Sequence, residues 1–361
     1  MQDYDITAAR TSQAVELVRK LKPRKEWALR ALPWLSKHVS ISALCNYQHC
    51  GDYMTMLTDA EDTRRKIETA FFCKQRLCPG CAWRASLRDA TCVSAISQAM
   101  VADGWVMLMA TLTVPNVQGD ILRETCRRIN TAWDKLMHRA AYKTAWANNI
   151  RKLEITYNAQ RDDYHPHLHI IVFVRPSYFR PRKGSNTYIS RDRLLADWRA
   201  AYVDDSITQV DVRRCRDSET GSNAILEVSK YCAKAADFTT SETVYDTMYK
   251  TLWHLRTMTY AGRCRALRAD YDAGLLDTYL PTDTTEYVWR LVYRYYADQG
   301  YQVVEREPYQ QEESRTDVRE RIANTRVLAR EQDLAAAREG IGWRVQRDLP
   351  TWADLLAGVD I

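Results

Sequence analysis

Three histidines occupy alternate positions in the segment DYHPHLHIIVFV, residues 163–174. Side chains two residues apart on a β-strand point to the same face, so His165, His167 and His169 would share one side of a sheet. Two imidazoles placed in this way can bind one cation of Zn, Mn, Fe or Cu. The chain has only seven histidines, and their alternation here favours a metal site over a solvated strand.

A third ligand for such an ion can be sought on the strand that precedes the histidines. Residues 151–174 have the pattern of a hairpin with a polar turn. If the turn centres between Arg161 and Asp162, Glu154 lies opposite His169, with the two Cβ atoms about 4.5–5.5 Å apart. We therefore expect Glu154 to complete the site, although a register shift of one residue would turn it to the other face.

A second candidate for chemistry is the segment NAILEVSKYCAKAADF, which has helical periodicity. On a helix, Glu227, Tyr231 and Lys234 would share one face. Tyrosine can act as a covalent nucleophile, glutamate as a general base, and lysine can hold a phosphate oxygen. Alone, this pattern is more typical of a solvated helix stripe. It indicates a site for chemistry only in combination with the histidine strand.

Two short pairs of cysteines predict a tetrahedral structural zinc site, because zinc sites of this kind use thiolates at such spacings. Five of the ten cysteines fall within residues 45–81. Cys73 and His49 are alternates for one of the ligands, and a group of buried free cysteines is the other interpretation. The four expected ligands are Cys45, Cys50, Cys78 and Cys81.

The composition sets broad limits on function. The 361 residues are 46% hydrophobic and carry a net charge of +6, which permits a sizeable core and is compatible with nucleic-acid binding. No signal peptide or membrane-spanning run is apparent, so we expect a cytoplasmic protein without a membrane partner. Disulfides are unusual in that compartment, which again favours metal for the clustered cysteines.

The elements that must position these residues alternate between strands and helices. This order predicts an α+β fold with a central, mainly antiparallel sheet flanked by helices. Upstream, Pro23 and Pro33 are expected to break a helical stretch at 6–40. The predicted elements are helices at 86–102, 120–148, 191–203, 222–238 and 311–346, strands at 105–116, 207–215 and 286–296, and the hairpin at 151–174.

Three consecutive parts are predicted along the chain. Residues 1–100 would form an N-terminal helical region with the cysteine, or zinc, element. Residues 101–262 would form the catalytic domain. Residues 263–361 would be a C-terminal extension of mixed strand and charged helix, which could dock DNA, mediate self-association or simply be solvated.

Three motifs resemble, in the same order, those of the rolling-circle replication initiators of small plasmids, the Rep members of the HUH endonuclease superfamily. The superfamily is named after two histidines that flank a bulky hydrophobic residue, here Leu168. A single tyrosine with a glutamate one turn before it is similar to the single-tyrosine branch. The motifs are TLTVPN (111–116), HPHLHIIV (165–172) and EVSKYCAK (227–234), and FCKQRLCPGCAWRAS (72–86) resembles a cysteine segment that precedes them in one branch.

The resemblance implies an HUH endonuclease fold, with the histidine strand central and the tyrosine helix beside it. It implies that Tyr231 attacks a DNA phosphodiester, which leaves a 5′-phosphotyrosine and a 3′-hydroxyl that primes a host polymerase. His167, His169 and Glu154 would hold Mg²⁺ or Mn²⁺, with His165 as a further candidate. Imidazole ligands suit Mn²⁺ better than Mg²⁺.

Further roles follow for the charged residues. Lys234 would pair with a phosphate oxygen, Lys230 would add to the positive field, and Glu227 would activate water to end the cycle by hydrolysis. Arg76 and Arg84 flank the cysteine cluster and could support origin DNA. The expected partners are plasmid origin DNA, a host DNA polymerase and, because no Walker-type loop is present, a host helicase.

Two other classes of protein share some of these features. A single-tyrosine transposase or a relaxase-like nickase uses the same chemistry, but the former lacks the cysteine segment and the latter carries its tyrosine near the N-terminus. A non-catalytic, zinc-dependent DNA-binding regulator would explain the cysteines. It would leave His167, His169 and Tyr231 without a role.

Overall fold

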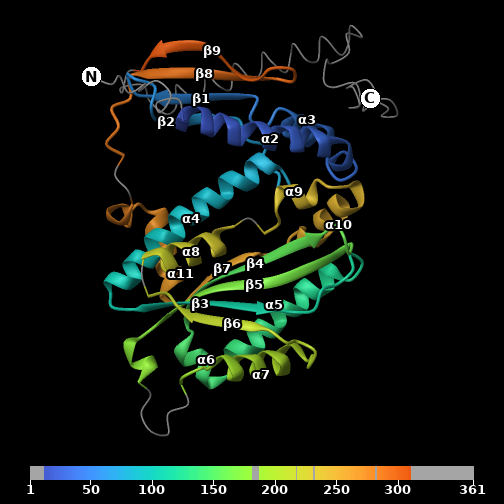
Figure 1. Cartoon of the computed structure of the whole chain (residues 1–361), viewed down its shortest axis with the longest axis vertical. Coiled ribbons are helices and arrows are strands. Elements are labelled where there is room, and N and C mark those ends of the chain that lie inside the picture. Colours follow the sequence, from blue (N-terminus) through green and yellow to red (C-terminus); the bar gives the residue numbers. More distant parts are fainter. Residues whose placement is uncertain (1–11, 181–186, 217, 231, 281–282, 310–361) are drawn as a thin grey trace, which may run out of the picture. The chain divides into compact units, whose positions relative to one another are not determined.

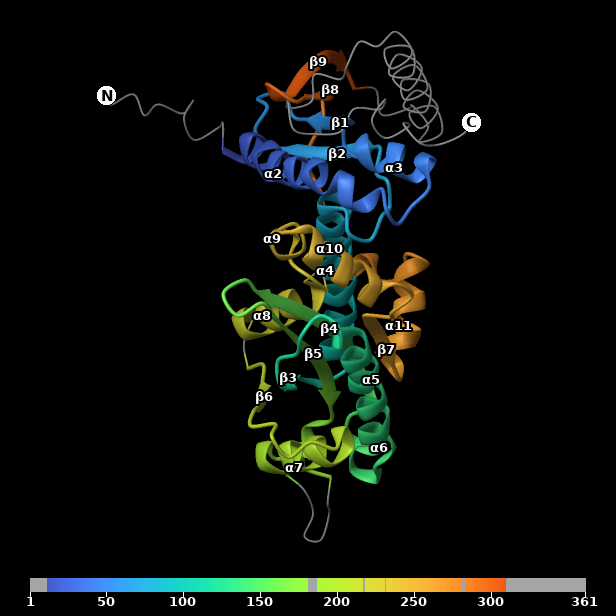
Figure 2. The ribbon, with the colours of Figure 1, turned by 90° about the vertical axis from the view of Figure 1, so that its right-hand side faces the viewer.

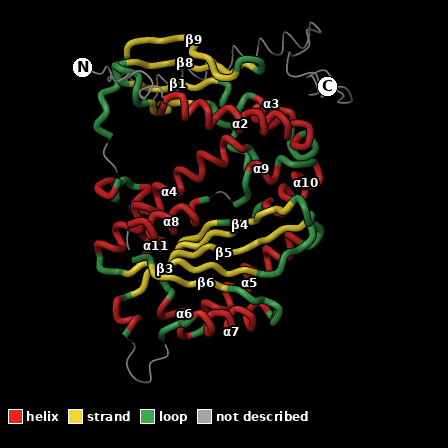
Figure 3. The backbone as a smooth tube through the Cα atoms, viewed as in Figure 1, coloured by secondary structure: helices red, strands yellow, loops and turns green. Residues whose placement is uncertain are grey.

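The chain divides into two compact units, each built around its own β-sheet (Figure 3). One unit comprises Met1–Ala82 and Asp283–Ile361, and the other comprises Trp83–Thr282. This division differs from the three consecutive parts expected from the sequence, because residues from both ends of the chain share the first unit. The computed structural model describes residues 12–180, 187–216, 218–230, 232–280 and 283–309.

The unit of residues 83–282 contains a five-stranded sheet with the order β6-β3-β5-β4-β7. Every neighbouring pair is antiparallel, and the histidine strand β5 lies at the centre. Both the α+β class and the predominantly antiparallel sheet are therefore confirmed. The strands are β3 (Val106–Thr113), β4 (Asn148–Asn158), β5 (Asp163–Val174), β6 (Val210–Arg214) and β7 (Met258–Ala261).

Helices pack on both sides of this sheet (Figures 1 and 2). On one face, α4 (Pro79–Ala102), α8 (Ser218–Ser229) and α11 (Arg263–Asp272) enclose a core around Ile171 and Phe173. On the other side lies α5 (Leu122–His138), next to α6 (Ala140–Ala145) and α7 (Arg191–Tyr202). The predicted helix at 120–148 is thus two helices, because Arg139 adopts an extended conformation between them.

The other unit contains a four-stranded antiparallel sheet with the order β2-β1-β8-β9. The strand predicted at 286–296 is confirmed as β8, whereas β1, β2 and β9 were not anticipated. β2 reads RKIETA, which has little of the hydrophobic alternation that reveals a strand. The strands are β1 (Tyr53–Thr58), β2 (Arg65–Ala70), β8 (Trp289–Tyr296) and β9 (Gly300–Pro308).

Two helices accompany this second sheet, α2 (Ser12–Leu35) and α3 (Ile41–Gln48). The prediction that Pro23 and Pro33 break the first helix is wrong, since both lie inside α2. A proline removes one backbone hydrogen bond. Among its described side chains, the helix buries five apolar ones, and this tertiary packing outweighs the loss. They are Leu21, Ala28, Ala31, Leu32 and Leu35.

The remaining described elements are short. They are η1 (Pro176–Phe179), α9 (Ala235–Phe238), α10 (Glu242–Leu252) and η2 (Asp277–Tyr279). The charged helix predicted at 311–346 lies outside the described residues. Among the helices that are described, none is long and apolar enough to cross a lipid bilayer.

Candidate metal centre and nucleophile segment

One face of the five-stranded sheet changes from apolar to polar along the strands. The cross-strand row through Ile171 includes Met109 and Ile150, and all three belong to the hydrophobic core. The next row on the same face, two residues along, is polar throughout. It consists of Asp211, Thr111, His169 and Lys152. Polar side chains here are held at the margin of a packed core, which fixes their positions.

Three ligand atoms converge on this polar part of the face. The Oε2 atom of Glu154 lies 3.2 Å from Nε2 of His169 and 3.5 Å from Nε2 of His167. The two Nε2 atoms are 3.1 Å apart. Ligands about 2.1 Å from one ion, at tetrahedral or octahedral angles, are separated by about 3.0–3.4 Å. The three residues therefore form a group that could hold a metal ion, here called the metal triad.

Hydrogen bonds on the far side of each imidazole orient the triad. Nδ1 of His167 donates to the carbonyl oxygen of His165 at 3.0 Å. That oxygen can only accept, so Nδ1 carries a hydrogen, and Nε2, which faces the triad, is the ring atom available to a metal ion. Nδ1 of His169 lies 3.3 Å from Oγ1 of Thr111. Metal-binding histidines are commonly held in this way.

The carboxylate of the triad is deeply buried, with Glu154 only 4% exposed. Burial alone would raise the pKa of Glu154, but the adjacent imidazoles of His167 and His169 outweigh burial and lower it below its ordinary range. The carboxylate is therefore ionised. Its oxygen and the Nε2 atoms of His167 and His169 are of the kinds that bind a divalent cation.

The hairpin register differs from the expected one. Glu154 pairs with His167, not His169, so the turn centres one residue earlier than predicted. The side chain of Asn158 fixes this turn by accepting hydrogen bonds from the backbone of Gln160 and Arg161, and Asp162 adopts a left-handed conformation. The residue opposite Glu154 differs by two positions from the expected one, so the side chain of Glu154 still lies on the expected face of the sheet.

His165 lies next to the triad without joining it. Its ring stacks on that of His167 with centroids 5.1 Å apart, and its Nδ1 lies 2.8 Å from Oδ1 of Asn116. Burial, followed by the charge of His167, lowers the pKa of His165. The ring lines a separate hollow of about 330 Å³ with Asn116 and Thr156. In the structure, His165 is thus a neighbour of the metal triad, and its backbone carbonyl orients His167.

The single helix predicted at 222–238 is wrong. α8 ends at Ser229, and Lys234 is an extended residue that precedes α9. The carbonyl oxygen of Cys232 accepts the N–H of Ile155 at 2.8 Å, so Cys232 lies at the edge of β4 that β7 leaves open. This backbone bond replaces helical continuation. Glu227 and Lys234 consequently do not share one helix face.

Described residues on both sides of Tyr231 lie close to the metal triad, while Tyr231 itself lies outside the described residues. On one side, Oε2 of Glu227 is 3.7 Å from Nε2 of His169, and Oε1 is 2.5 Å from Nζ of Lys230. On the other side, Cys232 is bonded to the residue that follows Glu154.

Four cysteines of the other unit also form a group that could hold a metal ion. The sulfur atoms of Cys50 and Cys78 are 3.4 Å apart, and Sγ of Cys81 lies 3.6 Å from Cys50 and 3.7 Å from Cys73. Thiolates about 2.3 Å from a tetrahedral zinc ion would be separated by about 3.8 Å. The four residues are therefore suited to such a site, here called the cysteine cluster.

The cysteine cluster includes Cys73 in place of the expected Cys45. The hairpin of β1 and β2 explains why Cys73 takes part. The backbone N–H of Gly51 donates a hydrogen bond to the carbonyl oxygen of Phe71, and this brings the chain that follows β2 close to Cys50. Cys45 is part of α3. His49, the other alternate, contacts Oδ2 of Asp52 through its Nδ1 at 2.9 Å.

The positions of the two arginines that were predicted to contact DNA do not test that role. Arg76 is half-buried in the loop between β2 and α4, and Arg84 is exposed on α4. Their role in DNA binding stays a prediction.

Sequence reasoning missed Lys152, which is only 3% exposed and lies directly opposite His169. Its Nζ atom is 3.6 Å from Oδ2 of Asp89 on α4. The alternation of Lys152 with Glu154 on one strand was the available signal, since residues two apart share a face.

Comparison with known proteins assigns the chain to a family. A family profile described as "Replication protein" matches residues 64–286. Protein rep of Staphylococcus aureus is 32% identical over 206 residues, covering 57% of this chain and 88% of the relative. Protein rep of Bacillus sp. is 32% identical over 250 residues, covering 62% and 79%. This chain belongs to the family of replication proteins. No solved structure matched it.

Proposed function

We propose that this protein initiates rolling-circle replication of a plasmid by nicking and rejoining one DNA strand at the origin, as an HUH endonuclease. The observation that carries the proposal is the convergence of Glu154, His167 and His169 beside Glu227 and the residues that flank Tyr231. Membership in a family of replication proteins supports the same conclusion.

In the proposed reaction, the Tyr231 hydroxyl attacks the scissile phosphate. A bond forms between phosphorus and the phenol oxygen, and the bond to the 3′-oxygen breaks. The phenol loses its proton and the 3′-oxygen gains one, so the step is a transesterification. The free 3′-hydroxyl then primes a host polymerase, while a host helicase unwinds the duplex.

The metal triad would hold Mn²⁺ or Mg²⁺, and two imidazoles beside one carboxylate favour Mn²⁺. When bound, the ion would polarise the scissile phosphate and stabilise the charge that develops on it. Thr111 and the His165 carbonyl keep the two imidazoles in place. Lys234 and Lys230 supply positive charge on either side of Tyr231 for the phosphate oxygens.

A nicking assay on supercoiled plasmid tests this function. The plasmid should carry the gene for this chain with its flanking DNA, because the origin is expected there. With Mn²⁺, we expect conversion to open circles and DNA covalently attached to protein, and with EDTA we expect neither. Failure to relax the plasmid with either Mn²⁺ or Mg²⁺ would contradict the proposal.

Glu227 is proposed to act after nicking, as the base that activates water when the cycle ends. The side chain is 39% exposed and lies beside His169, so water can reach it. The Glu227→Gln variant should nick at close to the normal rate, within about threefold, but release the attached strand at least about 100-fold more slowly. Release can be followed by the decay of the covalent complex on denaturing gels.

The matched control for this prediction is Glu219→Gln, which removes a carboxylate from the first turn of the same helix. It should both nick and release the strand normally. Equal release rates for Glu227→Gln and wild type would rule out the base role.

The cysteine cluster is proposed to hold a structural zinc ion, since its sulfur separations suit tetrahedral coordination. Cys73→Ser should reduce bound zinc from about one per chain to well below half, and should lower the melting temperature of the protein. Cys45→Ser should keep both values close to wild type. Zinc content by mass spectrometry and thermal unfolding check both variants, and zinc loss in Cys45→Ser alone would reverse the ligand assignment.

A further inference from the structure

Four side chains of β4 and β5 form the corners of a square on one face of the five-stranded sheet. Lys152 lies opposite His169, and Glu154 lies opposite His167. Residues two apart on a strand share a face, so the two pairs are neighbours along the strands. Opposed Cβ atoms are about 4.5–5.5 Å apart, and successive pairs on one face are about 6.7 Å apart. Three corners of the square are the metal triad, and the fourth is a lysine.

Lys152 is almost completely buried, since only 3% of the residue is exposed. A lysine is rarely buried without a partner, because its charge loses the stabilisation that water provides. Its ion-pair partner is Asp89 on α4, whose Oδ2 atom lies 3.6 Å from Nζ. This distance exceeds that of a hydrogen bond, and within the described ranges the ammonium has no other ion pair or hydrogen bond. The three N–H groups of Lys152 are thus only weakly satisfied by the residues around them.

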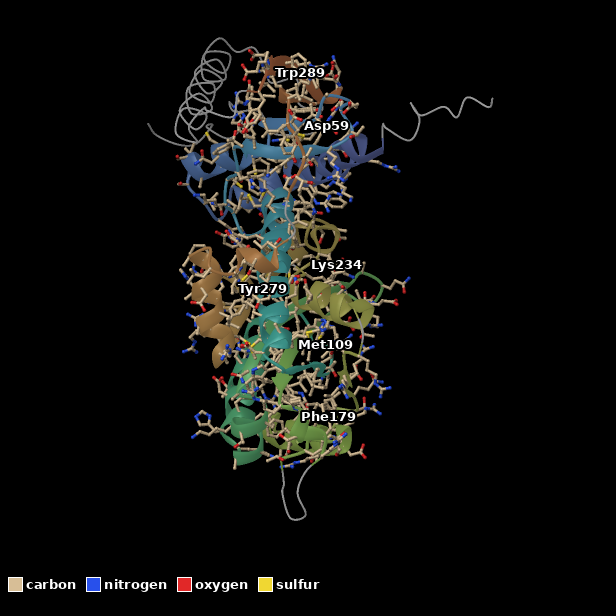
Figure 4. All side chains as sticks on the ribbon, turned by 90° about the vertical axis from the view of Figure 1, so that its left-hand side faces the viewer. Asp59, Met109, Phe179, Lys234, Tyr279 and Trp289 are labelled. Carbon is tan, nitrogen blue, oxygen red and sulfur yellow. The ribbon has the colours of Figure 1, made fainter. Side chains whose placement is uncertain are left out.

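Packing alone does not explain a charged pair at this place. The adjoining row of the same face is apolar, and it is formed by Met109, Ile150 and Ile171. Met109 of this row is labelled in Figure 4. On its other side, Lys152 lies opposite Met258 of β7. Buried ion pairs can often be replaced by apolar residues of similar volume without loss of stability. The lysine beside three potential metal ligands therefore indicates a role in the metal centre.

The two charges of the pair act on the metal triad with different strengths. The side chain of Lys152 is 4% exposed, whereas that of Asp89 is 17% exposed, so water screens the carboxylate more. Lys152 also extends from the same sheet face as the triad, while Asp89 extends from the helix α4. The pair therefore leaves an excess of positive charge at the triad. This excess opposes the binding of a cation and favours the approach of an anion.

We propose that Lys152, held by Asp89, sets the charge of the metal triad. It lowers the affinity of the triad for a divalent ion, and it is a positioning residue because it acts through the three ligands. The same positive charge strengthens the attraction of the centre for the scissile phosphate. This last part rests on the proposed function, whereas the effect on ion affinity requires only that the triad binds a metal ion.

Titration calorimetry of the full-length protein with Mn²⁺ tests the proposal without any reaction. Lys152→Met removes the positive charge with little change in volume and should raise the Mn²⁺ affinity at least about fivefold. Asp89→Asn leaves Lys152 without its counter-charge and should lower the affinity at least about twofold. The double variant Lys152→Met/Asp89→Asn should have an affinity between those of the two single variants.

The opposite signs of the two effects separate this role from a structural one. If the pair only anchored α4 on β4, either single change would break it, and both would change the affinity in the same direction. Changes in the same direction, or an unchanged affinity in Lys152→Met, would overturn the proposal. Thermal unfolding shows whether each variant is folded. If Lys152→Met does not fold, Lys152→Gln removes the same charge and should give the same increase.

The matched control is Lys135→Met, which removes an exposed lysine from α5 on the other side of the sheet. Its Mn²⁺ affinity should stay within about twofold of wild type, because distant exposed charges are screened. An increase equal to that of Lys152→Met would show a general effect of net charge and would overturn the specific role of Lys152.

The nicking assay at saturating Mn²⁺ separates this inference from the proposed function. Lys152→Met should nick at least about tenfold more slowly than wild type, although it binds the ion more tightly. If wild type binds Mn²⁺ but does not nick, the calorimetry decides the role of Lys152 and the nicking proposal falls. If wild type nicks and Lys152→Met binds Mn²⁺ no more tightly, the role of Lys152 falls and the nicking proposal stands.

Discussion

The Tyr231→Phe variant should show no detectable nicking, a loss of at least about 10⁴-fold, and no covalent attachment to DNA. Phenylalanine keeps the ring but removes the oxygen that would bond to phosphorus, so no other step can compensate. Open-circle formation on agarose gels measures nicking, and labelled DNA that migrates with the protein on denaturing gels measures attachment.

Two features of the experiment make the result specific. Tyr188→Phe, at an exposed tyrosine of the same unit, should retain full activity. The binding of single-stranded oligonucleotide in EDTA should be unchanged in Tyr231→Phe, which separates chemistry from affinity. Covalent attachment that survives in this variant would show that another residue is the nucleophile.

The His169→Ala variant should lose both Mn²⁺ binding and nicking, the latter at least about 10³-fold. Its imidazole approaches Glu154 and His167 and is held by Thr111, so its removal opens the metal triad. Titration calorimetry with Mn²⁺ measures ion binding directly, without any reaction. Nicking of the supercoiled plasmid at saturating Mn²⁺ measures the chemical consequence.

His165→Ala is the matched control on the same strand. Its side chain bonds to Asn116 and stacks on His167, while the contact that orients His167 comes from its backbone. Mn²⁺ affinity should therefore fall less than about tenfold. If His165→Ala loses the ion as completely as His169→Ala, then His165 is a ligand and the triad is misassigned.

The metal triad was predictable from sequence because side chains alternate between the two faces of a strand, so a register error of two residues leaves each side chain on its face. The register of β4 and β5 was wrong by two residues, yet Glu154 remained on the face of His167 and His169. An error of one residue would have removed it from the site. The residues that set the true register, Asn158 and Asp162, act through local turn geometry.

The errors elsewhere came from interactions between distant parts of the chain. Residues 222–238 have a continuous helical pattern, but the hydrogen bond from Ile155 to Cys232 interrupts it. Cys73 reaches the cysteine cluster only through the hairpin of β1 and β2, and the polar sequence of β2 concealed that hairpin. Local propensity carries no information on either contact.

The pairing of β1 with β8 has a consequence for folding during synthesis. β8 is translated after the whole unit of residues 83–282, so that unit can fold on the ribosome while β1 and β2 still lack their partner. Until residues 289–296 emerge, the β1 edge has unpaired backbone groups and is open to pairing with another chain. The unit that carries the cysteine cluster should therefore be the last to fold and the more dependent on protection by chaperones.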